Sequence, residues 1–232
     1  NKLEDVTKTK GDSAYIKEDY AAAIQIYEAL LKNGEASEVY YNLGNSYYKI
    51  GEIAKAVLNY ERALLLQPGN SDIRANLEVA RAKTIDKVEP TPEVFFISWT
   101  KSLINCMSVD AWAHGVLSLY SIDYRFLFLY ILQTDYVKEN RIHIRNHFAD
   151  LSLFALIFFL QQKEHLVNRS EAIVMNPSVT VRSTPSESGT SLFYSHEGEK
   201  GKCQRQLYER MERNSTGRWK VGWVPASAIE VI

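Results

Sequence analysis

The sequence lacks most of the residue patterns that accompany metal binding, disulfide formation or nucleic-acid binding. It has only two cysteines, Cys106 and Cys203, which lie far apart in segments of different character. This supports neither a disulfide framework nor a zinc site with paired ligands. Basic and acidic residues nearly balance, with 27 Lys and Arg against 28 Asp and Glu. The strong positive charge of a nucleic-acid-binding protein is therefore missing, and we expect no nucleic-acid partner.

The sequence also lacks a cluster of catalytic residue types. Its five histidines are scattered, without a nucleophile motif or a glycine-rich phosphate loop. His143 and His147 lie four residues apart, as on one face of a helix, but the glutamate of a zincin motif is missing. The sequence thus predicts a protein that is not an enzyme and that uses no cofactor, no metal and no small-molecule substrate.

The most regular pattern that is present lies in residues 37–70. Apolar and small residues recur there at intervals of three and four, which is typical of two amphipathic helices joined by the turn KIGE. Moving back by 33 residues superposes Gly11 on Gly44 and Tyr27 on Tyr60, and a partial third copy ends after one helix. Such a repeat indicates an α-solenoid with a closing helix.

This spacing resembles the tetratricopeptide repeat, whose small, aromatic and proline positions are matched almost completely by residues 37–70. Gly44 and Ala56 would let the two helices of the repeat approach closely. Tyr47 and Tyr60 would fill the gaps between hairpins, while proline after the second helix would end it. We expect all of these residues to be structural.

The same resemblance implies a concave groove, lined by the first helix of each hairpin, that binds peptides or extended protein segments. The residues expected to line it are Lys8, Asp12, Tyr15, Glu38, Tyr41, Asn42, Asn45, Lys49, Asp72 and Asn76. Lys8 and Asn42 match repeats that clamp the C-terminal carboxylate of chaperones, but Asp12 and Asp72 would repel a carboxylate. We therefore expect a groove that is not such a clamp. The alternative is that these polar side chains form only a solvated face.

Two apolar stretches follow a segment, VEPTPEVFF, whose prolines end the helical pattern. Residues 113–132 contain Asp123 and Arg125, and the apolar run at 148–160 has only 13 residues. A transmembrane helix needs about 20 apolar residues, so neither stretch is a clean span. Two interpretations stay open, a pair of buried helices in a soluble domain and a transmembrane hairpin, and we favour the hairpin.

Near residue 168 the pattern changes to alternation, as in short β-strands. Val179 and Val181 alternate with polar residues ahead of a turn cluster, and VGWVPASAIEVI ends the chain at 221–232. These two segments resemble the first and last parts of a bacterial SH3-like domain, a small β barrel. The resemblance places Trp223 in an aromatic patch that binds a peptide or a cell-wall segment, and the alternative for Trp223 is a core role.

Residues 200–220 do not fit this barrel, because they are strongly polar and helix-like where its middle strands are expected. Shifting the reading frame by one base, with synonymous codons chosen freely, gives an alternating, strand-like sequence. We hypothesise a compensated frameshift in the gene. Resequencing that finds the present frame intact, with no neighbouring insertion or deletion, would exclude it.

The order of these regions resembles the BatE-type proteins of bacterial aerotolerance (Bat) operons, on the segments above together with GDSAYIKEDYAAAIQIYEALL and SLINCMSVDAWA. The resemblance implies a multidomain chain, α then β. Its expected parts are a tetratricopeptide-repeat helical domain at 1–86, a linker at 87–103, a hydrophobic, transmembrane helical hairpin at 104–162 and an SH3-like β barrel at 168–232.

The BatE resemblance also implies a function. It implies a non-enzymatic scaffold, anchored in the membrane, with its repeats and barrel in the periplasm and with its signal peptide removed or left out. The implied partners are von Willebrand factor A type Bat proteins and a MoxR-type ATPase. The alternative is a soluble repeat adaptor whose SH3-like domain binds peptide or cell wall.

Overall fold

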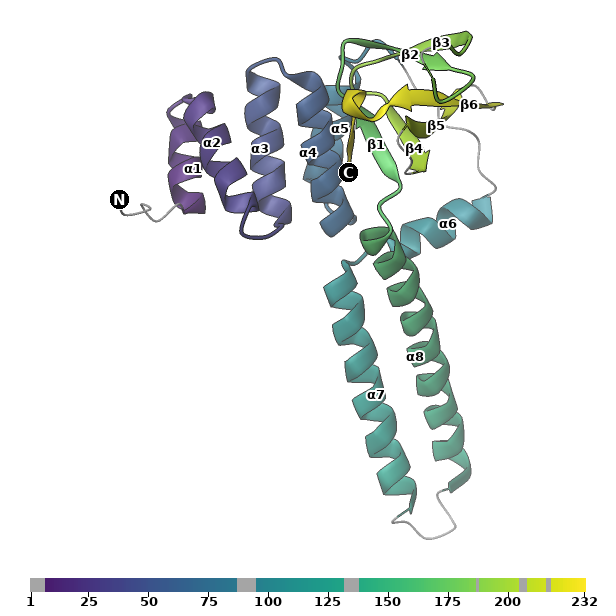
Figure 1. The fold of residues 1–232 in the computed structure, drawn as a ribbon. Helices are drawn as coiled ribbons and strands as arrows, with labels where there is room; N and C mark the ends of the chain where they lie inside the picture. Colours follow the sequence, from purple (N-terminus) through teal and green to yellow (C-terminus); the bar gives the residue numbers. More distant parts are fainter. Residues whose placement is uncertain (1–6, 87–94, 132–137, 187, 205–207, 216–217) are drawn as a thin grey trace. The chain divides into compact units, whose positions relative to one another are not determined.

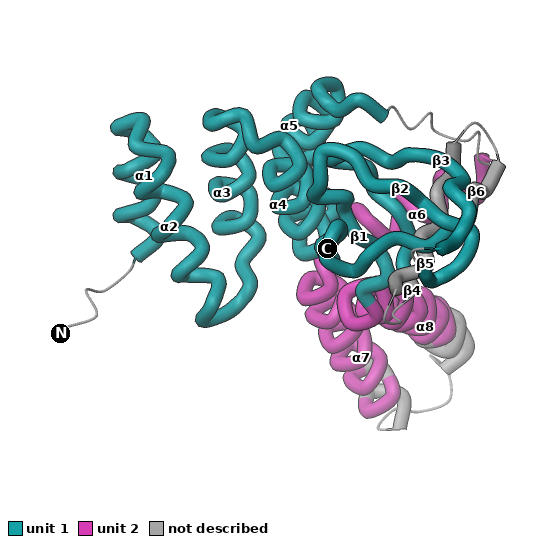
Figure 2. Tube along the Cα trace, turned by 45° about the horizontal axis from the view of Figure 1, so that its top comes forward, with its two compact units in different colours: residues 1–93, 169–232 teal, residues 94–168 magenta. Residues whose placement is uncertain are grey.

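The computed structural model describes residues 7–86, 95–131, 138–186, 188–204, 208–215 and 218–232. The chain divides into two compact units, one made of residues 1–93 and 169–232 and the other of residues 94–168 (Figure 2). Each unit is described by itself.

The first unit begins with antiparallel helices (Figure 1). They are α1 (Lys8–Ile16), α2 (Tyr20–Leu31), α3 (Ser37–Lys49), α4 (Ile53–Leu66) and α5 (Ser71–Arg81). Polar side chains mark two of the starts: Asp19 accepts a hydrogen bond from the Ala22 amide at α2, and Asn70 accepts from two amides at α5. The predicted helical repeats are therefore present.

The turn after the first helix of each hairpin needs a left-handed residue. Gly51, which follows α3, has φ +86°, and Glu18, which lies 33 residues earlier and follows α1, has φ +62°. Glycine adopts this conformation without steric cost, whereas a residue with a Cβ does not. The first repeat thus keeps the backbone of the second while it carries a less suitable residue.

Close helix packing explains the glycines within the repeats. A Cβ on Gly44 would lie 2.8 Å from two ring atoms of Tyr60, and one on Gly11 would lie 2.5 Å from the ring of Tyr27. Both tyrosines are buried in the helical core. The predicted structural roles of Gly44 and Tyr60 follow directly from this geometry.

The first unit also contains one antiparallel sheet. Its strands are β1 (Glu171–Val174), β2 (Ser178–Arg182), β3 (Ser191–His196), β4 (Lys200–Gln204), β5 (Tyr208–Ser215), β6 (Arg218–Pro225) and β7 (Ile229–Val231). Their spatial order is β3-β2-β6-β5-β4-β1-β7. Alternate residues such as Val179 and Val181 enter a small apolar core, as the alternation predicted.

Residues 200–220 look helix-like in sequence, yet their described parts form β4, β5 and the start of β6. The β5–β6 pairing runs from Tyr208 opposite Pro225 to Ser215 opposite Arg218. The helix-like composition of this interval therefore does not correspond to a helix in its described residues. The frameshift hypothesis is a separate matter and stays a prediction.

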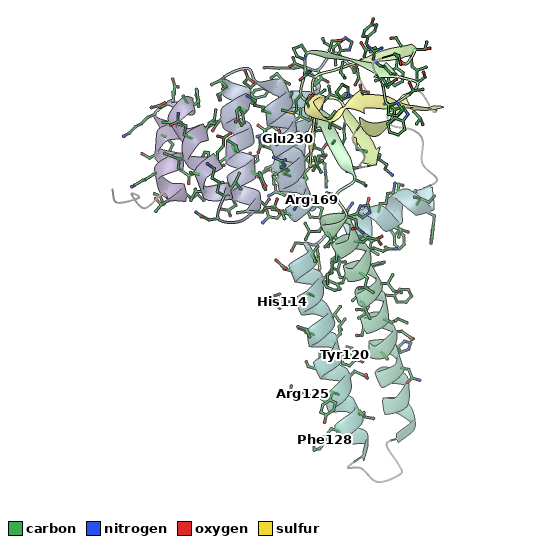
Figure 3. The ribbon with its side chains drawn as sticks, in the orientation of Figure 1. His114, Tyr120, Arg125, Phe128, Arg169 and Glu230 are labelled. Carbon is green, nitrogen blue, oxygen red and sulfur yellow. The ribbon has the colours of Figure 1, made fainter. Side chains whose placement is uncertain are left out.

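Sheet and repeats contact each other within this unit. Ile173 and Ile232 are buried in the same apolar cluster as the helices. Arg62 on α4 donates to Glu230 (3.0 Å), and Lys200 on β4 donates to the buried Glu61 (2.9 Å). Figure 3 labels Glu230 and also Arg169, whose guanidinium pairs with Glu35. Apolar burial and ion pairs thus join the two parts.

The second unit consists of α6 (Phe95–Ile104), α7 (Val109–Ile131) and α8 (Lys138–Val167), of which α7 and α8 form a long antiparallel hairpin (Figure 1). Trp112 on α7 and Phe158 on α8 meet edge to face, with ring centroids 5.3 Å apart. The Gln162 amide donates to the Met107 carbonyl oxygen (2.7 Å). A hairpin in the middle of the chain is therefore present.

The transmembrane part of that prediction has no support. Among the described residues, none of the helices combines the length and the apolar content needed to cross a membrane. Asp123 and Arg125 interrupt the apolar sequence of α7, and a charged side chain costs about 3 kcal/mol at the centre of a bilayer.

Candidate functional site

All ten residues predicted to line the groove lie on α1, α3 and α5. Within each helix, successive members are three or four residues apart, except that Tyr41 and Asn42 are adjacent, and this spacing places them on one face. Hydrogen bonds connect the three helices through this set of side chains. We call this surface the α1–α3–α5 face and define it by those ten residues.

Asp12 is the centre of the hydrogen bonds between α1 and α3. Its carboxylate accepts from the Tyr27 hydroxyl (2.7 Å), the Asn42 amide nitrogen (2.9 Å) and the Lys8 ammonium (3.2 Å). Lys8 also lies 3.3 Å from a carboxylate oxygen of Glu38. The hydrogen bond that Lys8 donates to Asp12, opposed by burial and aided by Glu38, raises the pKa of Lys8.

This geometry explains why the face does not resemble a carboxylate clamp. The two residues that match the clamp pattern, Lys8 and Asn42, both direct their donors to Asp12. A ligand carboxylate would have to compete with Asp12 for both donors and would also meet its negative charge. The contacts of Lys8 and Asn42 with Asp12 agree with the expectation that the face is not a carboxylate clamp, which stays a prediction.

A second cluster joins α3 and α5 through asparagine side chains. The Asn45 oxygen accepts from the Tyr60 hydroxyl (2.7 Å) and from the Asn76 amide (2.9 Å). The Asn76 amide also donates to the Tyr41 hydroxyl (3.0 Å). Because these bonds use one end of each amide, the Asn45 nitrogen and the Asn76 oxygen keep hydrogen-bonding capacity for another group.

The charged ends of the face point into solvent. Glu38 leaves 71% of its side chain exposed, and Asp72 and Lys49 are exposed as well. Tyr15 and Tyr41 are half-buried. Their rings pack on Tyr20 and Tyr60, with centroids 5.4 and 6.0 Å apart. The two aromatic residues therefore help to hold the helices as well as lining the face.

Two residues that orient side chains of the α1–α3–α5 face could not be recognised as such from the sequence. Tyr27 and Tyr60 appeared as space-filling core residues, yet their hydroxyls orient Asp12 and Asn45. Burial, aided by Asp12 for Tyr27, raises the pKa of both hydroxyls, so they stay protonated and able to donate well into the alkaline range. The signal was their tyrosine identity at a position where phenylalanine would fill the same space.

Trp223 lies on β6, half-buried and opposite Arg182 of β2 in the strand register. Exposed Leu192 and Tyr194 lie on β3, which pairs with the other side of β2. The predicted role of Trp223 in an aromatic binding patch stays a prediction. As to metals, a group of three or more His, Cys, Asp or Glu suited to an ion does not occur within the part of the chain that the structure describes.

Comparison with known proteins concerns the α3–α4 hairpin. Residues 37–70 match the family model of the tetratricopeptide repeat. The chain contains a tetratricopeptide repeat. This match confirms the assignment of the second repeat, and such repeats typically serve protein–protein interaction. A comparison with curated proteins finds no match to the chain.

Proposed function

We propose that this protein is a non-enzymatic adaptor that binds extended segments of partner proteins on the α1–α3–α5 face. The observation that carries the proposal is the set of oriented amides on a tetratricopeptide-repeat scaffold. Asn45 and Asn76 are fixed by Tyr60 and Tyr41, yet each keeps capacity for a further hydrogen bond. Groups fixed in advance lose less entropy when they bind a peptide.

The finer part of the proposal concerns partners. From the BatE resemblance we infer that the adaptor works with von Willebrand factor A type Bat proteins and a MoxR-type ATPase in an aerotolerance or stress complex. We further infer that the repeats and the sheet face the periplasm.

Membrane attachment is the third part, and it rests on the exposed surface of α7 and α8 together with the resemblance. Large apolar side chains are exposed along both helices, including Tyr120 (67%) and Phe128 (54%), which Figure 3 labels on α7, and Phe154 (58%) on α8. Many exposed large apolar side chains on one hairpin favour an interaction with a membrane or a protein.

Site-specific photo-crosslinking tests the adaptor proposal. A photoreactive residue would replace Asp72, which is exposed on the α1–α3–α5 face, in the full-length gene expressed with its native leader. The matched control replaces Glu52, an exposed residue between α3 and α4. We expect partner peptides, identified by mass spectrometry, to crosslink from position 72 and not from position 52. Equal crosslinking from both positions would overturn the proposal, and Bat or MoxR peptides would support its finer part.

Alkaline carbonate extraction tests membrane attachment. We expect the protein to stay in the membrane pellet and the variant Leu153→Asp/Phe154→Asp, at two exposed positions of α8, to be released. Leu192→Asp, at an exposed position of β3, is the matched control and should stay in the pellet. Release of the unmodified protein would favour the second candidate function.

That second candidate is a soluble adaptor whose sheet binds peptide or cell wall. The observation in its favour is the exposure of Leu192 and Tyr194 beside the β2–β6 pair that holds Trp223. Purified protein that sediments with peptidoglycan, together with a Trp223→Ala variant that does not, would support it.

A further inference from the structure

The α1–α3–α5 face carries an uneven charge along its length. Glu38 and Asp72 lie in the first turns of α3 and α5, Lys8 begins α1, and Asp12 lies one turn further along α1, whereas Lys49 lies in the last turn of α3. Glu38 and Lys49 are 11 residues apart, or about 16 Å along the helix axis. On this face, three carboxylates and one ammonium within the first two turns of the helices leave a net charge of −2 there.

The single cation at this acidic end is already engaged. Lys8 lies 3.2 Å from Asp12 and 3.3 Å from Glu38, so it neutralises carboxylates of its own face rather than those of a ligand. Among the described residues, Asp72 has no ion pair. Glu38 has one, with Lys8, and Lys8 also pairs with Asp12. A ligand that brings positive charge would therefore find carboxylate oxygens exposed to solvent.

The Asn45 and Asn76 amides of the same face favour the backbone of a chain over its terminus as the ligand. The Asn45 nitrogen can donate to a carbonyl oxygen, and the Asn76 oxygen can accept from an N–H. An extended chain offers both groups at every residue, whereas a terminal carboxylate offers acceptors alone and brings negative charge.

We propose that the α1–α3–α5 face selects internal, extended protein segments that carry lysine or arginine, and that it discriminates against C-terminal carboxylates. The inference rests on the proposed adaptor function and narrows the class of its partners. The basic side chain meets Glu38 and Asp72, while the backbone of the segment pairs with Asn45 and Asn76.

A rival explanation assigns the acids to helix stability alone. Glu38 and Asp72 both lie in the first turn of a helix, where a carboxylate interacts favourably with the helix dipole. In that case their replacement would lower thermal stability without changing which peptides bind. A measurement of peptide affinity separates the two explanations.

The probe is a random 12-residue library displayed between two folded domains, so that none of its peptides has a free C-terminus. It would be selected on the purified full chain and counter-selected on Asn76→Phe, a neutral and bulky change that obstructs the face. Circular dichroism would verify that the variant folds. We expect the selected peptides to be enriched in lysine and arginine and to lose affinity as salt is raised.

Matched variants then test the carboxylates. We expect Glu38→Gln and Asp72→Asn each to weaken binding of a selected peptide by about two- to fivefold. The controls are Glu52→Gln, whose carboxylate lies 3.2 Å from Lys55 much as that of Glu38 lies 3.3 Å from Lys8, and Asp19→Asn, which keeps a capping side chain. Both controls should leave affinity unchanged.

The outcomes distinguish this inference from the proposed function. Peptides that depend on an open face but show no basic enrichment, or that bind Glu38→Gln and Asp72→Asn unchanged, overturn the inference and leave the adaptor function standing. If the counter-selection on Asn76→Phe removes every peptide that binds the full chain, both the inference and the adaptor function are overturned.

Discussion

Replacing Gly44 by alanine tests whether the repeat depends on the absence of a side chain at this position. The new Cβ would lie 2.8 Å from two ring atoms of Tyr60 and 3.3 Å from a third. Tyr60 is only 2% exposed, so its ring has little room to move. Either the ring or one of the two helices must therefore shift.

Two effects of the Gly44→Ala change oppose each other. Alanine favours the helix over glycine by about 0.8–1.0 kcal/mol. Overpacking of a well-packed core typically costs about 1–3 kcal/mol. The clash with buried Tyr60 should therefore prevail, and we expect the free energy of unfolding to fall by about 1 kcal/mol.

A double-mutant cycle with Tyr60→Leu isolates the clash. Without the ring, Gly44→Ala should stabilise the protein by up to about 1 kcal/mol, the helix-propensity effect alone. The two changes should thus couple by about 1–3 kcal/mol. Native-state hydrogen exchange of the α3 and α4 amides measures this locally, apart from the second unit.

A glycine in the second unit provides the control for this test. Gly115→Ala on α7, where an added Cβ meets nothing within 4 Å, should show only the gain in helix propensity. If Gly44→Ala stabilises the protein equally with and without the Tyr60 ring, close packing at this glycine is refuted.

Three further predictions concern the same unit. Burial, followed by the bond to Glu35, raises the pKa of the Tyr40 hydroxyl to about 12, so the stability that needs its neutral phenol should persist up to pH 10 and be lost toward pH 12. An absorbance titration measures the ionisation, and in Tyr40→Phe the step assigned to this phenol should be missing. The bond from Arg169 lowers the pKa of Glu35, so stability from this pair is present above the ordinary value of 4.5 and lost as pH falls below it; Glu35→Gln should reduce this acid loss in unfolding measured against pH. Glu18→Gly, at φ +62°, should raise the free energy of unfolding by about 0.5–1 kcal/mol in urea titrations.

A different result would contradict each of these three predictions. A Tyr40 phenol that ionises near pH 10 would show that the hydroxyl is not buried. Acid unfolding of Glu35→Gln identical to that of the unmodified protein would show that the pair with Arg169 contributes nothing. A less stable Glu18→Gly would show that glycine's extra freedom in the unfolded chain outweighs the relieved strain.

The helical repeat could be predicted from the sequence because its packing depends on which residues are small and which are large. Gly44 must be small because Tyr60 is large and lies against it. Both facts appear in the sequence as a regular spacing, and the same spacing recurs 33 residues earlier in Gly11 and Tyr27. Complementary volumes leave a pattern that one sequence is enough to show.

The hydrogen bonds of the face could not be predicted in the same way. Lys8, Asn42 and Tyr27 all direct donors to Asp12 across three helices. Any one of them could instead have faced solvent without changing the residue spacing. Sequence position gives the face on which a side chain lies, but its partner depends on how neighbouring helices are rotated and spaced.

The strands within residues 200–220 could not be predicted from their own sequence. Their polar composition hides the alternation on which strand prediction depends, yet β4 pairs with β1 and β5 pairs with β6 along its whole length. Strand preference is set largely by the neighbours that a segment pairs with. Here those neighbours include apolar segments such as Glu171–Val174, far away in the sequence.

The sheet covers part of the repeat array, in addition to the closing helix that was expected to do so. A closing helix was expected, and α5 is present, but Ile173 and Ile232 of the sheet are buried in the helical core as well. The contacts that join sheet and repeats fall on Glu35, on Glu61 and Arg62 of α4 and on Asp86 beyond α5. Among the described residues, none of those contacts involves the ten side chains of the α1–α3–α5 face. The sheet thus packs against a second helix, α4, and covers apolar surface of the array without such contacts to the first-helix face in the part of the chain that the structure describes.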